Sequence, residues 1–167
     1  MKSLKTKIMY IVNIVLAVLM YVFLSQSYIT YTYDIGVSSG SEKLLSGYDI
    51  INHYFEGEGA EVMMALSNLL VTILCAIVIL ISIYGLLVSF GVIKESKFTK
   101  LANLINVIVS IALVVFGAIS LICTFIHLDG ASSGGNGLVV GWAVILNLIL
   151  GVVTLITSIL ASRFAKK

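Results

Sequence analysis

The stretch Lys94-Glu95-Ser96-Lys97-Phe98-Thr99-Lys100 decides the fold, because it lies between two long runs that contain no charged residue. The run before it extends from Val62 to Ile93, and the run after it extends from Leu101 to Leu128. Each is longer than the roughly 20 helical residues that cross a hydrocarbon core about 30 Å thick. A connection as short as residues 94–100 predicts that the two runs form an antiparallel helical hairpin.

Two further uncharged runs flank this hairpin, from Ile8 to Leu24 and from Leu138 to Ser162. The chain is 60% hydrophobic and only 11% charged, so a soluble globule could not cover these runs with polar surface. We therefore predict an all-α integral membrane protein that forms a single domain over residues 1–167. The expected fold is a left-handed antiparallel bundle of four transmembrane helices, at about residues 8–27, 62–93, 101–126 and 138–162.

The charges are divided between the two sides of such a bundle. Nine of the ten basic residues lie before the first run, in the connection 94–100, or after the fourth run. Seven of the eight acids lie in the other two connections, and only Lys43 and Glu95 break the pattern. Because basic residues beside short loops stay in the cytoplasm, we expect both termini and the connection 94–100 to be cytoplasmic. The connections 28–61 and 127–137 would then face outward.

The two outer connections differ in expected structure. Residues 28–33 are rich in tyrosine and β-branched residues, which is typical of a short strand or of a helix extension with tyrosines at the headgroup level. Residues 46–55 have apolar side chains at helical spacing, which predicts a short amphipathic helix within the connection 28–61. The connection 127–137 is rich in Gly and Ser and is expected to be a pliable turn.

Neither outer connection contains a cysteine, and the chain has no Asn-x-Ser/Thr acceptor for glycosylation. These absences suit the plasma membrane of a bacterium, which is the expected location of this multi-pass protein. The run from Ile8 to Leu24 is longer than the apolar core of a signal peptide and lacks a small-residue cleavage site. We therefore expect it to remain as a membrane helix.

Small and polar residues recur on one face of each predicted helix. In the third helix, Asn103, Asn106 and Ser110 begin a row whose steps alternate between three and four residues. A mean step of about 3.5 residues keeps one face turned toward its neighbours in a left-handed bundle. The polar members of these rows, called the polar seam below, are Asn13, Asn68, Thr72, Ser82, Asn103, Asn106, Ser110, Ser120, Asn147, Thr154 and Ser158.

Two roles are compatible with the polar seam. Inside lipid, small residues let helices approach, and Ser, Thr and Asn side chains form hydrogen bonds between them, so the seam can serve packing alone. Alternatively it lines a polar path, but no charged residue or histidine lies in the centre of a helix, and ion or proton pathways usually contain one. We therefore favour packing. The expected pairs are Asn13 with Asn106 toward the cytoplasm, and Asn68 with Asn147 in the outer half.

Polar and aromatic residues of the outer connections are candidates for binding. The expected contact surface consists of Tyr48, His53, Tyr54, Phe55, Glu56, Glu58 and Glu61. Together with His127 and Asp129, its histidine and acids could hold a divalent cation, because imidazole and carboxylate are suitable ligands. Their spacing matches no defined metal site, and acids in a solvated loop are the simpler interpretation. We expect no bound metal and no cofactor.

The sequence contains no motif for catalysis or for nucleic-acid binding. Serines and two histidines occur, but nothing ties a nucleophile to a base and an orienting group. A thiol oxidoreductase needs paired reactive thiols, whereas Cys75 and Cys123 lie in separate apolar runs. Membrane topology accounts for the basic residues, which leaves no patch for a nucleic acid. The sequence therefore predicts a protein that is not an enzyme.

Known four-crossing families share the layout of this chain but not its residues. Claudins carry a Trp-Gly-Leu-Trp segment and two cysteines in a large first outer loop, and residues 28–61 contain neither tryptophan nor cysteine. Tetraspanins have a large cysteine-bearing loop between the third and fourth crossings, where this chain has only a short turn. A shared layout alone carries no function.

These observations favour a non-catalytic small tetraspan protein that acts as an accessory, assembly or protective partner of another membrane component. Its expected partners are the lipid bilayer and either another membrane protein or further copies of itself. The alternative is a subunit of a small oligomeric channel or transporter, which rests on the polar seam and on the acidic outer side.

Overall fold

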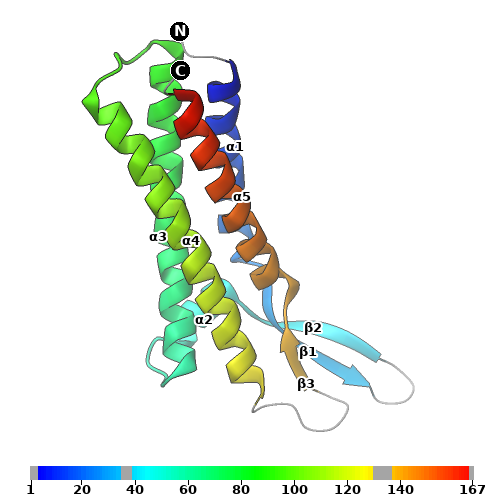
Figure 1. The fold of residues 1–167 in the computed structure, drawn as a ribbon. Coiled ribbons are helices and arrows are strands. Elements are labelled where there is room, and N and C mark those ends of the chain that lie inside the picture. Colours follow the sequence, from blue (N-terminus) through cyan, green and yellow to red (C-terminus); the bar gives the residue numbers. More distant parts are fainter. Residues whose placement is uncertain (1–3, 35–38, 130–136, 166–167) are drawn as a thin grey trace.

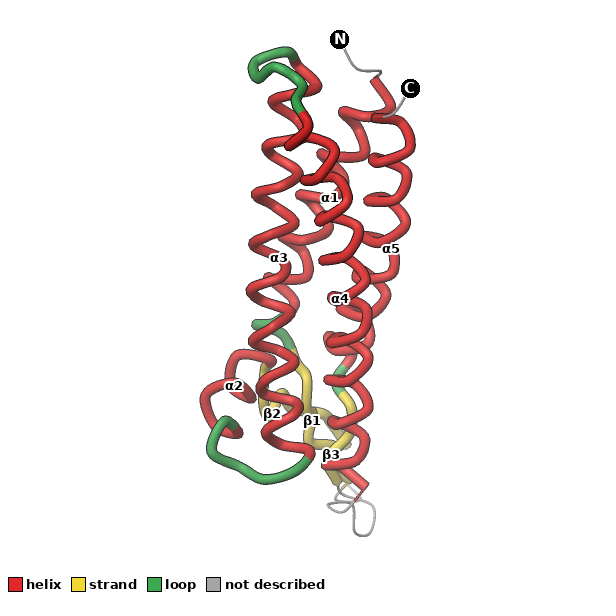
Figure 2. The backbone as a smooth tube through the Cα atoms, turned by 60° about the vertical axis from the view of Figure 1, so that its left-hand side comes forward, coloured by secondary structure: helices red, strands yellow, loops and turns green. Residues whose placement is uncertain are grey.

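Four long helices dominate the structure, a computed structural model that describes residues 4–34, 39–129 and 137–165. They are α1 (Leu4–Phe23), α3 (Ala60–Phe90), α4 (Lys97–Asp129) and α5 (Trp142–Ala165). Each is long and apolar enough to cross a membrane, which confirms the predicted helices as candidate spans. Both α1 and α4 pack against α3 and α5, so the four helices close a ring around a common axis (Figures 1 and 2).

The two ends of the bundle carry different elements. The beginning of α1, the end of α5 and the connection between α3 and α4 lie together at one end, called the termini end below (Figure 1). Three strands and the short helix α2 (Gly47–Tyr54) lie at the opposite end, called the sheet end (Figure 2). Successive long helices therefore run antiparallel. The left-handed twist of the bundle and its orientation in a membrane stay predictions.

The structure is mostly helical, as predicted, but it is not all-α, because the sheet end contains a three-stranded antiparallel sheet. Its strands are β1 (Ser27–Asp34), β2 (Ser39–Ser46) and β3 (Gly137–Val140), in the order β2-β1-β3. The strand expected at residues 28–33 is present as the middle of β1. Because β3 directly precedes α5, the central strand β1 joins the connection between α1 and α3 to the connection between α4 and α5.

Alternation of side chains gives the sheet two different faces. Ile29 lies opposite Leu45 on one side and Val140 on the other. All three belong to the apolar core, and Ile29 is fully buried there. On the other face, Thr30 lies opposite Lys43 and Val139. The apolar face therefore covers the end of the bundle, and the polar face points away from it.

At the sheet end, strands shorten α1 and α5 relative to their predicted bounds. α1 ends at Phe23 rather than near residue 27, because Ser27 already pairs with Ser46. α5 begins at Trp142 rather than at residue 138, since β3 occupies the preceding residues. α4 continues to Asp129, into the turn predicted at residues 127–137. Residues 130–136 of that turn lie outside the described residues.

At the termini end, a glycine sets the end of α3. Gly91 adopts a φ of 81°, which is accessible to glycine without strain, and its N–H donates to the carbonyl oxygen of Val88 at 3.0 Å. The helix therefore stops at Phe90 rather than at residue 93. The connection between α3 and α4 occupies residues 91–96 rather than 94–100, because α4 already begins at Lys97.

A capping box fixes the start of α2, the short helix expected within residues 46–55. The Asp49 N–H donates to Ser46 Oγ at 3.1 Å, and the Ser46 N–H donates to the Asp49 carboxylate at 2.8 Å. The Ser46 hydroxyl also donates to that carboxylate at 2.6 Å. This hydroxyl bond and the backbone bond lower the pKa of Asp49. Two of the unpaired N–H groups at this helix start are thereby satisfied.

Replacing Ser46 with alanine is expected to destabilise α2 by about 1 kcal/mol, the usual worth of an N-cap side chain. Because folding lowers the pKa of Asp49, its contribution is complete above the ordinary value of 3.8 and is lost as the pH falls through the lowered pKa. Amide hydrogen exchange of residues 48–54 measures both effects. Asn52→Ala, at an exposed position of the same helix, is the control. Equal exchange in the two variants would contradict the capping role.

Candidate functional site

The polar seam forms a buried column inside the bundle. All of its members are buried except Thr72, which is half-buried and donates to the Asn68 carbonyl of its own helix at 2.9 Å. Along α3, the inward positions near Thr72 belong to Val71 and Val78 instead. The seam therefore consists mainly of side chains that are shielded from lipid, whereas Leu, Ile and Val side chains make up most of the exposed helix surface.

Ser158 is the centre of a hydrogen-bond network in the half of the bundle toward the termini end. Its Oγ accepts bonds from the side-chain amides of Asn13 in α1 and Asn106 in α4, each at 3.1 Å. It also bonds Ser110 Oγ at 2.9 Å, and Thr157 donates to the Asn13 side-chain oxygen. The predicted Asn13–Asn106 pair is thus brought together through a third side chain. Three helices meet on one hydroxyl group, called the Ser158 hub below.

A tyrosine connects α3 to this half of the bundle. Tyr10 is buried, and its hydroxyl donates to the Asn103 side-chain oxygen in α4 at 2.6 Å. Its ring lies against Gly85 of α3, where an added Cβ would come within 2.5 Å of the ring. Gly85 therefore provides the space that the aromatic ring needs.

In the half of the bundle toward the sheet end, the predicted pairing of Asn68 with Asn147 is wrong. Asn68 accepts a hydrogen bond from Ser120 in α4 at 2.7 Å. The Asn147 amide donates instead to the hydroxyl of Tyr28, a buried residue of β1. Burial raises the pKa of Tyr28, so its hydroxyl stays protonated. The sheet is therefore fastened to α5 by a bond that the helix pattern could not predict.

Four buried polar atoms of the seam have no hydrogen-bond partner within the described part of the chain. They are Asn68 Nδ2, Ser82 Oγ, Asn106 Oδ1 and Asn147 Oδ1. Most of the other seam groups bond each other or a carbonyl of their own helix. The seam therefore supplies strong contacts between helices together with a small number of unused polar sites.

The expected contact surface lies on α2 and the turn that follows it. His53, Phe55, Glu56 and Glu58 are exposed, and Tyr48, Tyr54 and Glu61 are partly buried against neighbouring elements. Phe55, which is 48% exposed, presents an aromatic ring beside two acids. We call the four exposed residues the α2 surface.

Three side chains from three helices fasten the end of α2. The Tyr54 hydroxyl lies 3.3 Å from His127 Nε2, and His127 Nδ1 lies 3.4 Å from a carboxylate oxygen of Glu61. A neutral imidazole with its proton on Nδ1 would satisfy both partners. Burial and, to a lesser extent, the charge of Glu61 raise the pKa of Tyr54, which keeps the hydroxyl available as a donor. These contacts join α2 to α3 and α4.

The structure brings only part of the suggested metal site together. Glu61 contacts His127, but His53 is exposed and bonds the Asp49 carbonyl of its own helix at 2.8 Å. Within residues 4–34, 39–129 and 137–165, no group of three or more possible metal ligands occurs. His53 therefore lies apart from the pair that Glu61 and His127 form.

Tyr28 and Tyr48 have contacts that could not be predicted from the sequence. Tyr48 packs edge-to-face against Tyr21 of α1 with ring centres 5.7 Å apart, and its hydroxyl donates to the Tyr21 carbonyl at 3.1 Å. Tyr28 was expected at the headgroup level, whereas it is buried among α1, α5 and the sheet. The only sequence feature that indicates the burial of Tyr28 is its position directly after the buried row of the first helix.

Comparison of the chain with protein-family models, with curated protein sequences and with solved structures found no match.

Proposed function

We propose that this chain is a non-catalytic, multi-pass plasma-membrane protein that serves as an accessory, assembly or protective partner of another membrane component. The α2 surface is the proposed contact region. The single observation that carries this proposal is an exposed aromatic and acidic surface on a segment that is fastened to the bundle at both of its ends. The charge distribution of the sequence supports an orientation with the sheet end outside the cell.

The composition of the α2 surface suits recognition of another protein. Aromatic residues are enriched at the centres of protein interfaces, and polar residues form the rim. Phe55 supplies the aromatic group here, and Glu56 and Glu58 supply the rim. A partner with an apolar pocket surrounded by basic side chains would match this arrangement.

The attachment of α2 supports a preformed binding surface. The capping box fixes the start of the helix, and the contacts of Tyr54 with His127 fix its end. Ile50 is fully buried in the core between these points. A surface that is already ordered loses less conformational entropy when it binds, so it binds more tightly than a flexible loop of the same composition.

Site-specific photocrosslinking in living cells tests the proposal. A benzoylphenylalanine introduced in place of Phe55 is expected to give an adduct of one defined larger mass, identified by mass spectrometry. The same probe in place of Leu101, exposed in α4 near the termini end, is the control and should not give that adduct. Adducts with lipid alone, or with a second copy alone, would contradict an accessory role for the α2 surface.

A second candidate function, a subunit of a small oligomeric channel or transporter, is favoured by the four unpartnered polar atoms of the seam. Such atoms could line a path for water or a polar solute when several copies assemble. Reconstitution into planar bilayers distinguishes the two functions. A conductance that Asn106→Leu abolishes would support the channel, and wild-type bilayers without conductance would support the accessory role.

A further inference from the structure

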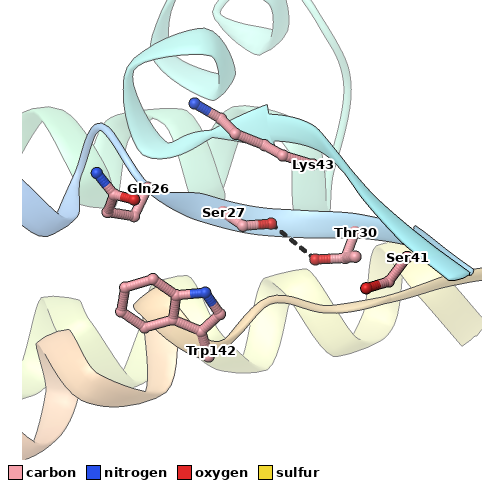
Figure 3. A pocket seen from close by; sticks show the side chains of 6 residues that line it. All are labelled: Gln26, Ser27, Thr30, Ser41, Lys43 and Trp142. Carbon is pink, nitrogen blue, oxygen red and sulfur yellow. Dashed lines mark hydrogen bonds between the residues drawn. The ribbon is translucent and has the colours of Figure 1, made fainter.

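An open cavity of about 290 Å³ lies on the polar face of the sheet, beside the start of α5 (Figure 3). Its walls come from the turn between α1 and β1, from β1 and β2, and from α5, and the lining residues are Gln26, Ser27, Thr30, Ser41, Lys43 and Trp142. Figure 3 shows the indole of Trp142 on one side and the strands on the other. The segments that form this cavity are distant in sequence, and the pairing of β1 with β3 brings them together.

The register of the sheet explains why Thr30, Ser41 and Lys43 share one face, and the register irregularities between Ser27 and Thr30 bring Ser27 to the same side. Thr30 lies directly opposite Lys43, and Ser41 precedes Lys43 by two residues on the same strand. Side chains two residues apart in a strand point to the same face, so Ser41, Lys43 and Thr30 are neighbours. Glu42 lies between Ser41 and Lys43 and therefore points to the opposite face. Lys43 therefore lines the cavity, with its ammonium group directed toward the Ser25 carbonyl, whereas the adjacent Glu42 is not among the lining residues.

The lining consists of groups that can donate hydrogen bonds. Lys43 Nζ donates to the Ser25 carbonyl at 2.8 Å, and an ammonium group has two further N–H bonds to offer. The indole N–H of Trp142 is a donor only, and the hydroxyls of Ser27 and Thr30, which bond each other at 2.7 Å, leave one O–H to donate to a ligand. Among the described residues, no carboxylate lines the cavity. A ligand that matches these walls carries negative charge and several acceptor oxygens, which is the chemistry of a phosphate group.

The position of the cavity relates it to the membrane surface. Trp142 is the first residue of α5, and its ring packs edge-to-face against Phe23, the last residue of α1, with centres 5.5 Å apart. Both helices are candidate membrane spans, so their ends at this cavity lie near the boundary between hydrocarbon and water. Tryptophan at such a boundary lies at the level of the lipid headgroups.

We infer that this cavity binds the phosphate of an anionic phospholipid headgroup, with Lys43 as the charged contact and Trp142 beside the glycerol region. This inference explains the basic residue that breaks the charge pattern of the sequence. Lys43 is the only lysine or arginine in the outer connections, which carry seven acids. The negative charge of these acids would repel anionic lipid from this end of the protein. Enrichment of anionic lipid near Trp142 would therefore indicate a local binding site.

The single tryptophan of the chain provides a direct measurement, because Trp142 lines the cavity. The full-length protein is reconstituted into phosphatidylcholine vesicles that contain a small fraction of lipid with brominated acyl chains, which quench tryptophan fluorescence on contact. Quenching of Trp142 by brominated phosphatidylglycerol is expected to report a local concentration of this lipid about fivefold higher than that of brominated phosphatidylcholine at the same fraction. This value corresponds to about 1 kcal/mol for one lysine near anionic lipid. Equal quenching by the two lipids would overturn the inference.

Two variants separate a local site from general electrostatics and from a structural role of Lys43. The exchange E42K/K43E keeps the net charge but moves the cation to the other face of β2, and it is expected to abolish the excess quenching. K43R keeps a positive charge at position 43 and is expected to retain the excess quenching. Excess quenching that survives the exchange, or that is lost in both variants, would overturn the inference. Quenching by brominated phosphatidylcholine checks that Trp142 keeps its depth in each variant.

A further arm distinguishes a lipid from a free phosphate compound. Glycerol phosphate added in solution is expected to leave the excess quenching unchanged, because a lipid is held at the site by its acyl chains as well as by its headgroup. Unbrominated phosphatidylglycerol is expected to remove it by competition. If millimolar glycerol phosphate removes the excess as effectively, the cavity recognises a soluble phosphate and the lipid is not its ligand.

Discussion

Gly141→Ala is expected to lower the free energy of unfolding by about 3 kcal/mol, the upper range for a methyl group that has no space. Gly141 lies between β3 and α5, and its N–H donates to the Tyr28 carbonyl at 2.7 Å. A Cβ at this position would overlap backbone atoms of Ser27 and Tyr28. Because backbone cannot move aside as a flexible side chain can, β3 must shift away from β1. The bond between Tyr28 and Asn147 is then expected to weaken as well.

Unfolding by a denaturing detergent, followed by circular dichroism, measures this loss. Gly117→Ala is the matched control, because a Cβ there would approach no atom of Leu148 closer than 3.6 Å. In the interior of α4 that substitution is expected to be neutral or to stabilise by up to about 1 kcal/mol, since alanine has the higher helix propensity. Similar unfolding of the two variants would show that the contact between Gly141 and β1 is unimportant.

Ser158→Ala is expected to lower the free energy of unfolding by about 2 kcal/mol. The substitution removes the one oxygen that Asn13, Asn106 and Ser110 share. Bonds between membrane helices contribute about 0.6 kcal/mol each on average and up to about 2 kcal/mol. The two amide groups would also be left buried without this partner, which adds a desolvation cost.

The same unfolding measurement applied to Ser89→Ala provides the control for the Ser158 hub. Ser89 is also fully buried, but its hydroxyl donates only within its own helix, to the Leu86 carbonyl at 2.8 Å. Its replacement is expected to cost less than about 0.5 kcal/mol, because no contact between helices is lost. If the two serine variants were equally stable, the hub would not contribute to helix association.

The long helices could be predicted from the sequence because lipid imposes a simple requirement. A helix that crosses the hydrocarbon needs an uncharged run of sufficient length, and each of the four runs meets it. The buried rows follow from the same physics. Asn103, Asn106 and Ser110 recur at helical spacing, and all three are buried in the structure.

The sheet could not be predicted in full because its strands are recognisable only through their partners. Residues 137–140 continue an apolar run and look like the start of a helix, but they pair with β1. β2 contains Gly, Ser, Glu and Lys, which are not enriched in strands. Its bonds to β1, rather than its composition, define it as a strand.

The partners within the candidate site were equally difficult to predict. Asn147 and Tyr28 are separated by 119 positions, and no local pattern connects them. Asn68 and Asn147 lie at similar depth in the bundle, but similar depth alone does not bring two side chains into contact. In the structure these residues bond different neighbours, Ser120 and Tyr28. Depth restricts the possible partners of a seam residue, but the neighbouring elements select among them.

The order β2-β1-β3 also has a consequence for biosynthesis. The ribosome delivers β1 and β2 one after the other, so their hairpin can form early, whereas the second edge of β1 stays unpaired until α2, α3 and α4 have been made. During that interval the exposed edge can pair with a foreign strand, and quality-control proteases can recognise it. Arrival of β3 therefore closes this edge, because it pairs the connection before α5 with the strand that follows α1.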